Sequence, residues 1–265
     1  MTNPLQQATE LLWRHHREGS LLDALPAAWR PHTHAHGHAI QAQLPQVADD
    51  RVVGWKIAAT SAAGQAHIQV SGPLAGRILS RFVVDGAAPV SLTGNQMRVC
   101  EPEFAFRMAH ALAPREAAYS VAEVLGAVAT LHPAFELPDS RFADFASAGQ
   151  AQLIADNACC GDFYFGPAAP AGWRELDLPN HAVHAVVSAA GSTRYSRDGD
   201  GRAALGDPRI ALTWLVNELS ALGITLGAGQ VVSTGTCMVP LQIQPGDRVD
   251  ADFGVLGRIA ISLTD

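Results

Sequence analysis

Glycine and proline interrupt this sequence so often that a bundle of long helices is disfavoured. The 265 residues include 24 glycines and 16 prolines, and both types are unfavourable inside helices and strands. Hydrophobic residues make up 48 % of the chain but aromatic residues only 6 %, so small aliphatic side chains supply most of the core. We therefore expect an α+β fold with many short elements, in which helices surround a mainly antiparallel or mixed β core.

The charge balance argues against nucleic acid as a partner. The chain carries 18 Lys and Arg against 25 Asp and Glu, a formal net charge of −7, so it has no basic surplus for phosphates. The glycine-rich segments 199–201 and 223–229 lack the strand, loop and helix pattern that binds nucleotides. Residues 219–246 carry no charge, but their polar, Gly and Pro residues predict buried strands and no membrane span.

The four cysteines predict a reducing environment. Cys100, Cys159, Cys160 and Cys237 show neither the spacing of a disulfide framework nor a zinc-type C-x-x-C pair. Adjacent cysteines are poorly placed to bridge each other, and no local feature marks them as nucleophiles. We expect structural thiols and a cytoplasmic location.

The first 50 residues differ in character from the rest. Pro4 begins a helical pattern that Gly19 ends, and a short helix is expected within 34–44. The irregular residues around this second helix are a candidate lid or subunit contact. We therefore expect an N-terminal helical extension, 1–50, and a main domain, 51–265, that together form one continuous domain.

The other elements follow from apolar runs and capping residues. Strands are expected at 52–60, 96–106, 134–137, 181–188, 230–234, 248–253 and 258–263, with helical spacing after 106. Helices are expected from a Ser120 and Glu123 capping box to 128, from an Asp139 cap over 142–154, and from Asp207 to 222.

The sharpest chemical feature is Glu101-Pro102-Glu103. In an extended strand, residues two apart project from the same face, so both carboxylates point into one region of an apolar segment. Glu136, with apolar residues on both sides, is a third acid of this kind. Grouped carboxylates suit a hard divalent cation such as Mg²⁺ or Mn²⁺. The alternative is a solvent-facing glutamate pair on an edge strand.

Two further features allow more than one interpretation. Lys56 lies in an apolar strand, where its ammonium needs an anionic partner unless the head group reaches water. Histidines alternate at His32, His34, His36 and His38. In a strand they would share one face and suggest zinc, whereas in a helix only residues four apart do. The run contains no acidic ligand, so a solvated surface is the alternative.

Taken in order, these residues resemble the 2-keto-4-pentenoate hydratase family of the fumarylacetoacetate hydrolase superfamily. The similarity extends from about Arg51 to the C-terminus. It rests on GWKI at 54–57, TS at 60–61, EPE at 101–103, ELPDSR at 136–141, DNACCG at 156–161, LGDP at 205–208, WLVN at 214–217 and TGTC at 234–237. Each segment is ordinary alone, and the ordered set is specific.

The resemblance implies a mixed β-sandwich roll like the C-terminal part of fumarylacetoacetate hydrolase, with surrounding helices and an N-terminal helical extension. It implies Mg²⁺ or Mn²⁺ held by Glu101, Glu103 and Glu136, with Lys56 as the catalytic cation. The substrate-binding residues it implies are Ser61, Asn157, Gly235 and Thr236. It also implies a homo-oligomer, and a complex with another enzyme of the same pathway is a further expectation.

The expected reaction is the addition of water to a 2-hydroxy-2,4-dienoate from the meta-cleavage of aromatic compounds, which gives a 4-hydroxy-2-oxo acid. Within the superfamily, the alternatives are a 4-oxalocrotonate-like decarboxylase and a C–C bond hydrolase. A non-catalytic paralogue that binds a 2-oxo acid is the alternative from another class.

Two departures from the family pattern bear on this choice. Hydratases of the family often carry an acidic residue where this chain has Leu74 after Pro73, which leaves the group that moves the proton unassigned. Gly37 and His38 replace the usual Ala-Tyr. A hydrolase would need a His–Glu pair to activate water, and residues 32–50 contain no glutamate.

Overall fold

The computed structural model describes residues 3–86 and 88–265. Its α-helices are α1 (Pro4–Glu18), α2 (His34–Gln41), α3 (Leu44–Ala48), α4 (Ala62–His67), α5 (Val121–Gly126), α6 (Gln150–Ala155) and α7 (Pro208–Ala221). Short 3₁₀ turns lie at Ser80–Phe82, Phe145–Ser147, Asn157–Cys159, Ala171–Glu175, Gly201–Ala203 and Gly254–Leu256. In this part of the chain, no helix combines the length and apolar character needed to cross a bilayer.

The strands are short and numerous, as the glycine and proline content predicts. They are β1 (Val52–Ala58), β2 (Leu74–Leu79), β3 (Val90–Ser91), β4 (Val99–Met108), β5 (Val128–Leu137), β6 (Asp162–Phe165), β7 (Ala182–Ala189), β8 (Ser192–Asp200), β9 (Val231–Thr236), β10 (Leu241–Gln242), β11 (Asp247–Asp252) and β12 (Arg258–Thr264). They form a larger sheet in the order β2-β1-β9-β4-β5-β6, with β10 beside β4, and a smaller sheet in the order β3-β12-β11-β7-β8.

The two sheets make the mixed β core that the sequence predicts. β1 and β9 are parallel, as are β12 and β3, and the other pairs are antiparallel. Phe104 on β4 packs edge-on against Phe253, just after β11, with 5.4 Å between ring centroids, so the core lies between the sheets. The α+β fold class is therefore confirmed.

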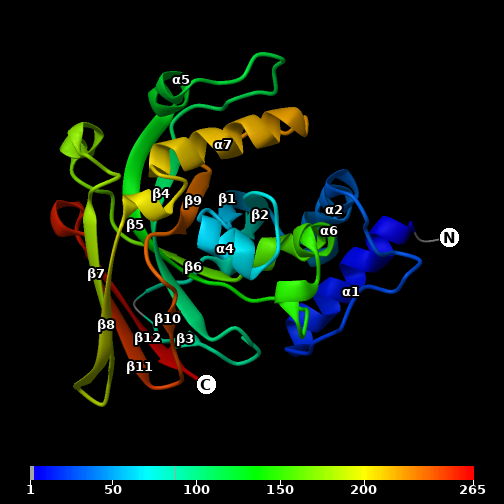
Figure 1. Ribbon diagram of the computed structural model, residues 1–265, viewed down its shortest axis with the longest axis horizontal. Coiled ribbons are helices and arrows are strands. Elements are labelled where there is room, and N and C mark those ends of the chain that lie inside the picture. Colours follow the sequence, from blue (N-terminus) through cyan, green and yellow to red (C-terminus); the bar gives the residue numbers. More distant parts are fainter. Residues whose placement is uncertain (1–2, 87) are drawn as a thin grey trace.

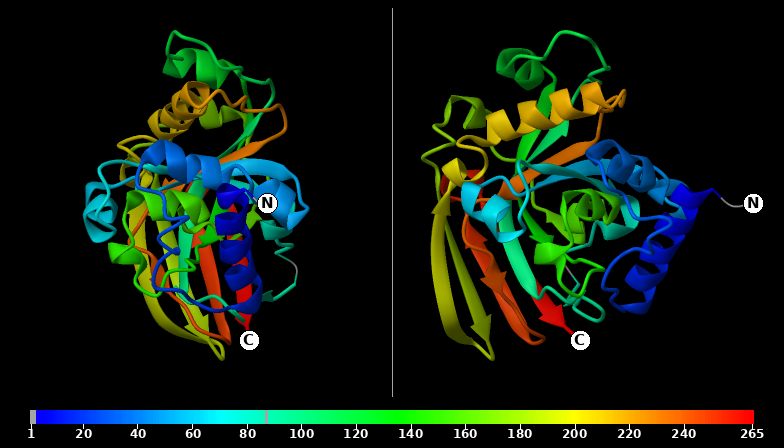
Figure 2. Two further views of the ribbon diagram at one scale, coloured as in Figure 1. Left: turned by 90° about the vertical axis from the view of Figure 1, so that its right-hand side faces the viewer. Right: turned by 45° about the vertical axis from the view of Figure 1, so that its right-hand side comes forward.

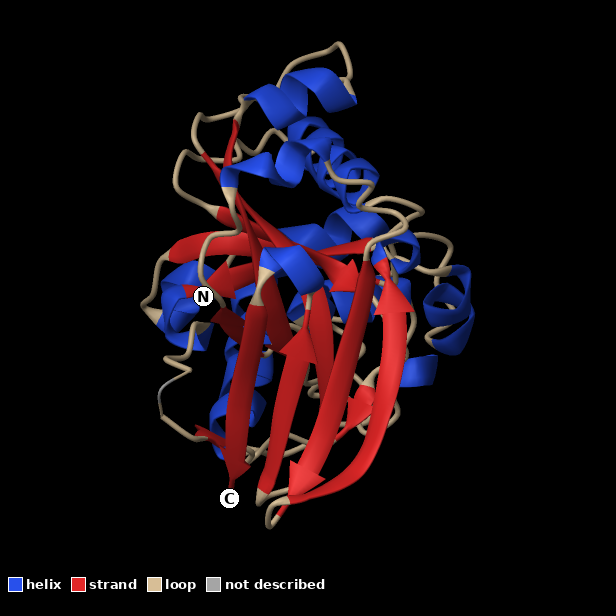
Figure 3. Cartoon of the chain, turned by 90° about the vertical axis from the view of Figure 1, so that its left-hand side faces the viewer, coloured by secondary structure: helices blue, strands red, loops and turns tan. Residues whose placement is uncertain are grey.

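The helices surround this core unevenly. α1, α2 and α6 lie on the side of the molecule away from β7 and β8, and α7 crosses over the larger sheet (Figures 1 and 2). Figure 3 looks onto the long strands of the smaller sheet. The larger sheet, with helices on its flank, is the part that positions the site described below.

Capping residues mark several helix ends as predicted. Asn3 Oδ1 accepts from the backbone N–H of Leu5, and Gly19 ends α1 in the left-handed conformation. The Ser120 and Glu123 capping box begins α5. Asp207 caps α7 ahead of a proline at its first position.

Three expectations about local structure are wrong. Asp139 does not cap a helix: its Oδ1 accepts from the backbone N–H groups of Gln96 and Met97, and α6 begins only at Gln150. The run after 106 stays extended to the end of β4, and the helix expected to 128 ends at Gly126, because β5 begins at Val128. Strand pairing within the sheet sets both the end of β4 and the end of α5.

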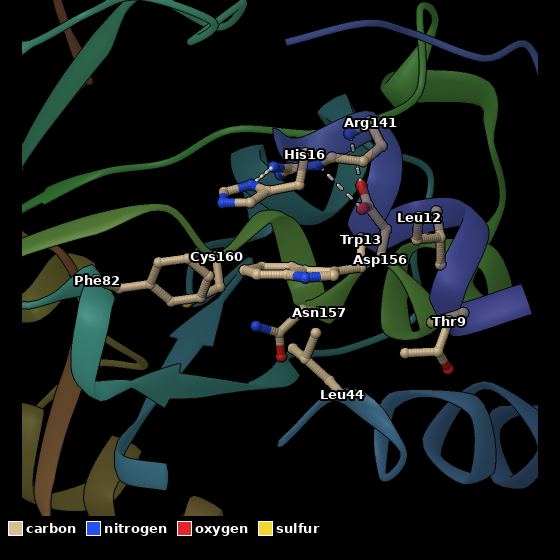
Figure 4. A pocket seen from close by; sticks show the side chains of 11 residues that line it. Thr9, Leu12, Trp13, His16, Leu44, Phe82, Arg141, Asp156, Asn157 and Cys160 are labelled. Atoms are coloured by element: carbon tan, nitrogen blue, oxygen red, sulfur yellow. Dashed lines mark hydrogen bonds and ion pairs between the residues drawn. The ribbon is translucent and has the colours of Figure 1, made fainter. Parts of the chain in front are cut away.

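His16 forms part of the contact between α1 and the rest of the protein (Figure 4). Its ring stacks on Trp13 with 4.8 Å between centroids, and its Nδ1 lies 2.6 Å from Nη1 of the buried Arg141. Arg141 also pairs with Asp156 at 3.2 Å and with Asp139 at 3.5 Å. Because Arg141 donates to Nδ1, the imidazole must be neutral. Burial, and then the charge of Arg141, lower the pKa of His16 to about 3.

Because His16 is neutral in the folded protein, the stability of the protein should depend on pH. Between pH 6.5 and about 3, His16 is protonated in the unfolded chain but not in the folded chain. The contribution of His16 to the free energy of unfolding is therefore complete above pH 6.5 and is lost as the pH falls. We expect His16→Phe to flatten the fall in unfolding free energy between pH 6.5 and 4 by about 1–2 kcal/mol. Urea titrations at several pH values measure it, with His110→Gln, an exposed histidine, as control. An unchanged slope in His16→Phe would contradict the assignment.

Candidate active site

Three glutamates converge on the larger sheet. Glu101 on β4 lies directly opposite Glu136 on β5 in the antiparallel register, and Glu103 follows two residues along the same face. Each offers one carboxylate oxygen, and these atoms all lie within 4.8 Å of one another. The structure thus brings together the three acids that the resemblance implies as metal ligands.

The carboxylate of Glu103 is held in place from one side only. Its side chain is fully buried, and its Oε2 accepts from Ser233 Oγ at 2.6 Å and from the backbone N–H of Gly235 at 2.9 Å. Within the described residues, Oε1 has no hydrogen-bond partner. Burial, and then the charge of Glu101, raise the pKa of Glu103 to about 7.

Glu136 is also fully buried, and its Oε2 has no hydrogen-bond partner among the described residues. Burial raises the pKa of Glu136 well above its ordinary value, although Lys56 opposes the shift. A buried carboxylate oxygen without a partner destabilises the fold, because it has lost its hydrogen bonds to water and has formed none in their place. A cation bound among the three glutamates would offset this loss of hydration.

Lys56 on β1 completes the cluster. Its side chain is buried, and Nζ lies 2.9 Å from Glu136 Oε1 and donates to the backbone carbonyl of Ala158 at 3.0 Å. Burial alone would lower the pKa of Lys56, but Glu136 and Glu101 outweigh it and hold the pKa above its ordinary value. The ammonium therefore stays charged. The alternative in which its head group reaches water is wrong.

The charges and donor atoms of this cluster fit Mg²⁺ or Mn²⁺. Three carboxylates and one ammonium carry a net charge of −2 when all are ionised, which one divalent cation neutralises. All the available donor atoms are carboxylate oxygens, which hard cations prefer. The unpartnered oxygens of Glu103 and Glu136 are free to serve as ligands. The alternative of a solvent-facing pair on an edge strand is wrong, because β4 is interior to the sheet.

A cavity of about 660 Å³ opens beside the cluster. Lys56 and Glu101 line it, together with three of the residues expected to bind substrate, which are Ser61, Gly235 and Thr236. Much of the remaining wall is apolar and is formed by Ile57, Ile68, Met97, Val99, Phe145, Met238, Val239 and Pro240. A charged end and an apolar wall suit a small organic acid with a hydrocarbon tail.

The three substrate-binding candidates in the wall also have local structural roles. Ser61 Oγ caps α4 by accepting from the N–H of Gly64, and Thr236 Oγ1 donates to the carbonyl of Met238. Gly235 has φ 94°, and a Cβ there would lie 2.3 Å from Thr60 Oγ1. Only glycine therefore fits this position, where its N–H faces Glu103.

Two other residues singled out in the sequence lie away from the cavity wall. The Asn157 side chain pairs with the backbone of Arg77, accepting at 2.7 Å and donating at 2.9 Å, and it does not line the cavity. Leu74 is buried in an apolar cluster with Ile40 and Leu153. The position where related hydratases often carry an acid is therefore part of the packing between the N-terminal helices and β2.

Sequence reasoning missed three residues of the site. Ser233, which orients Glu103, belongs to a strand whose pairing with β4 no local pattern reveals. His67 on α4 and Arg197 on β8 both line the cavity. Arg197 lies in a polar strand that lacks an apolar run, whereas the Ser61 cap could have revealed α4 and hence His67.

Comparison with known proteins agrees with this geometry. No protein-family model matches the chain. It is 31 % identical over 227 residues to a 2-hydroxyhexa-2,4-dienoate hydratase of Comamonas testosteroni, covering 84 % of this chain and 82 % of that protein. It is 31 % identical over 209 residues to a 2-keto-4-pentenoate hydratase of Paraburkholderia xenovorans, covering 79 % and 75 %.

The fold is shared with a solved enzyme. A 4-oxalocrotonate decarboxylase from Pseudomonas putida G7, complexed with magnesium and adipate, superimposes with a TM-score of 0.85 at 22 % identity over 98 % of this chain and 97 % of that one. A fumarylacetoacetate hydrolase family protein from Yersinia pestis gives a TM-score of 0.57 at 20 % identity, over 81 % of this chain and 94 % of that one. With the two sequence relatives, these similarities show that the chain belongs to the 2-keto-4-pentenoate hydratase family and has the fold of the fumarylacetoacetate hydrolase superfamily.

Proposed function

We propose that this protein is a divalent-metal-dependent hydratase that adds water to a 2-hydroxy-2,4-dienoate and yields a 4-hydroxy-2-oxo acid in the degradation of aromatic compounds. The observation that carries the proposal is the buried cluster of Glu101, Glu103 and Glu136 with Lys56, at one end of a cavity with an apolar wall. Two relatives named as dienoate or pentenoate hydratases support the same reaction.

The three glutamates would hold Mg²⁺ or Mn²⁺. Bound there, such an ion supplies positive charge that stabilises the enolate form of a 2-oxo acid. The protein's part is to hold the carboxylates in register across β4 and β5, and to fix the Glu103 carboxylate through Ser233 and Gly235. These strand contacts pre-organise the ligands and exclude water from two of them.

Lys56 acts as a fixed positive charge and hydrogen-bond donor. Its ammonium has three N–H groups, of which one is directed at Glu136 and another at the carbonyl of Ala158. The third is available to a substrate oxygen, since Lys56 also lines the cavity. Because its pKa is raised, Lys56 stabilises developing negative charge and does not act as a general base.

The wall of the cavity would receive the diene. Met97, Val99 and Phe145 offer apolar contacts to a carbon chain. His67 on the same wall is a candidate to move the proton that hydration requires, since Leu74 does not provide a carboxyl group there. Ser61 and Thr236 remain candidates for contacts with the substrate.

A decarboxylase acting on a 4-oxalocrotonate-like acid is the second candidate. It is favoured by the superposition on the 4-oxalocrotonate decarboxylase. A C–C hydrolase receives less support, because it would need a His–Glu pair to activate water, and His38 with Glu218 does not line the cavity. The non-catalytic paralogue would keep ligand binding and lack turnover.

One experiment separates these candidates. We expect the purified protein with Mg²⁺ to bleach the ultraviolet absorbance of a five- to seven-carbon 2-hydroxy-2,4-dienoate and to form a 4-hydroxy-2-oxo acid without releasing carbon dioxide. Chelation of the metal should stop the reaction, because the three glutamates are left without their cation. Carbon dioxide from 4-oxalocrotonate would favour the decarboxylase instead, and no bleaching with any dienoate would contradict the hydratase.

The assembly and location are part of the same proposal. We infer a cytoplasmic homo-oligomer, supported by four buried, unpaired cysteines and by exposed apolar residues outside the cavity, such as Ile210 and Val255. A complex with a neighbouring enzyme of the pathway remains an expectation. Light scattering gives the mass of the assembly.

A further inference from the structure

Two of the four alternating histidines lie beside an acidic residue from a distant part of the chain, although residues 32–38 contain none. His34 and His38 lie four residues apart on α2, and the Nε2 atom of each is 3.6 Å from Glu218 Oε1 on α7. The partner comes from a helix about 180 residues further along the chain, outside residues 32–50, which contain no glutamate. The three ligand atoms lie within 4.8 Å of one another, and none of the three residues lines the active-site cavity.

His38 is the unusual member of this group. The residue is only 5 % exposed, and in the described part of the chain neither ring nitrogen has a hydrogen-bond partner. A buried imidazole normally donates or accepts at least once, because an unpaired polar atom is costly. The 3.6 Å to Glu218 is too long for a good hydrogen bond.

The same separation is close to that of two ligands on one metal ion. Zinc bonds of about 2.0–2.1 Å in tetrahedral geometry place neighbouring ligand atoms about 3.3–3.4 Å apart. The 3.6 Å between each Nε2 and Glu218 Oε1 therefore needs only a small contraction. The side chain of His34 is 41 % exposed, so the fourth position of such an ion would open to water.

Both helices hold their ligands rigidly. A Cβ at Gly37 would meet the carbonyl oxygen of Ala151 at 2.5 Å, so glycine allows α2 to lie tightly against α6. Gln41 donates to the carbonyls of Ala75 and Ile154, which ties the same helix to β2 and α6. α7 packs on β9 through buried residues. This rigidity pre-organises the three side chains.

We propose that His34, His38 and Glu218 form a second metal site, for Zn²⁺ or a similar transition-metal ion, with water as the fourth ligand. Two imidazoles and one carboxylate select such ions, whereas the all-oxygen cluster of Glu101 and its partners selects Mg²⁺ or Mn²⁺. The ion joins α2, in the N-terminal extension, to α7 in the main domain. Its role is to fasten the extension, and the proposal does not depend on the reaction catalysed.

Metal binding to the full-length protein tests this site. With Mg²⁺ saturating the glutamate cluster, we expect one Zn²⁺ or Co²⁺ per chain, a Co²⁺ visible spectrum typical of low coordination number, and a rise in Tm of about 5 °C with Zn²⁺. His34→Gln and His38→Ala should each weaken Zn²⁺ binding by more than about 10-fold and remove the Tm rise. His34 is half-exposed, so its variant is expected to fold even if His38→Ala does not.

Two controls separate this site from other binding. His36→Gln alters a partly exposed histidine on another face of α2 and should bind Zn²⁺ as the parent does. Glu101→Gln should also keep the Co²⁺ spectrum, since it changes only the other cluster. Zinc binding that is unchanged in His34→Gln, or lost in Glu101→Gln, would overturn the proposal, as would no binding above the Mg²⁺ background.

Discussion

Glu103→Gln is expected to reduce Mg²⁺-dependent turnover by at least about 10³-fold while the fold stays intact. The amide oxygen of glutamine can take the place of Oε2 and accept from Ser233 and Gly235, as the carboxylate does. The amide NH₂ group then replaces Oε1, the atom that has no hydrogen-bond partner among the described residues. A donor at that position cannot serve as a ligand, so the variant loses cation binding without losing volume.

The stability of the metal-free variant distinguishes the loss of a metal ligand from a general destabilisation of the fold. The pKa of Glu103 is raised to about 7 from an ordinary value near 4.5, so the folded, metal-free protein holds a proton that the unfolded chain releases between these pH values. Its stability therefore falls as the pH rises through this window, whereas glutamine does not titrate. We expect metal-free Glu103→Gln to be more stable than the parent by about 1–2 kcal/mol above pH 7, and nearly equal to it at pH 5.

Thermal melts with and without Mg²⁺, at pH 5 and pH 8, measure both effects. The parent should gain Tm when Mg²⁺ is added, and the variant should not. Glu116→Gln, an exposed glutamate outside the cluster, is the matched control and should keep full turnover. Full turnover in Glu103→Gln would show that the cluster is not the catalytic centre.

The shared face of Glu101 and Glu103 could be predicted from the sequence, whereas the position of Glu136 opposite them could not. A strand places Glu101 and Glu103 on one face whatever it pairs with, because side chains alternate. The pairing of Glu101 with Glu136 depends on the register of β4 and β5, which the 19 residues that connect these strands (109–127) do not encode locally. The apolar neighbours of Glu136 marked it as a third acid, and the ordered resemblance to a family predicted that it joins the other two.

The errors have the same physical origin. Asp139 has the sequence context of a helix cap, but its carboxylate accepts instead from Gln96 and Met97, more than 40 residues away. β8 was missed because its residues are polar and largely exposed, so it forms by pairing with β7 and not by burial. Helix ends with caps, as in α1 and α7, were predicted well because a cap acts within a few residues.

Lys56→Met is expected to separate cation binding from catalysis. Its ammonium lies beside Glu136, where it competes with a bound cation for the same negative charge. Removing it changes the net charge of the cluster from −2 to −3, so the affinity for Mg²⁺ should stay the same or increase. Turnover should nevertheless fall by about 10²–10⁴-fold, because the third N–H donor and its positive charge are lost.

The same variant should depend on metal for its stability. Truncating one partner of a buried ion pair leaves Glu136 uncompensated and costs about 3–5 kcal/mol in the metal-free protein. Mg²⁺ should restore most of this loss, because it takes over the role of the ammonium. Lys56→Arg, which keeps the charge, is the companion variant. Calorimetric titration with Mg²⁺ and the rate of dienoate bleaching measure the two properties independently. Parallel losses of both would mean that Lys56 serves only to hold the glutamates, whereas retained affinity with lost turnover assigns its charge to the reaction.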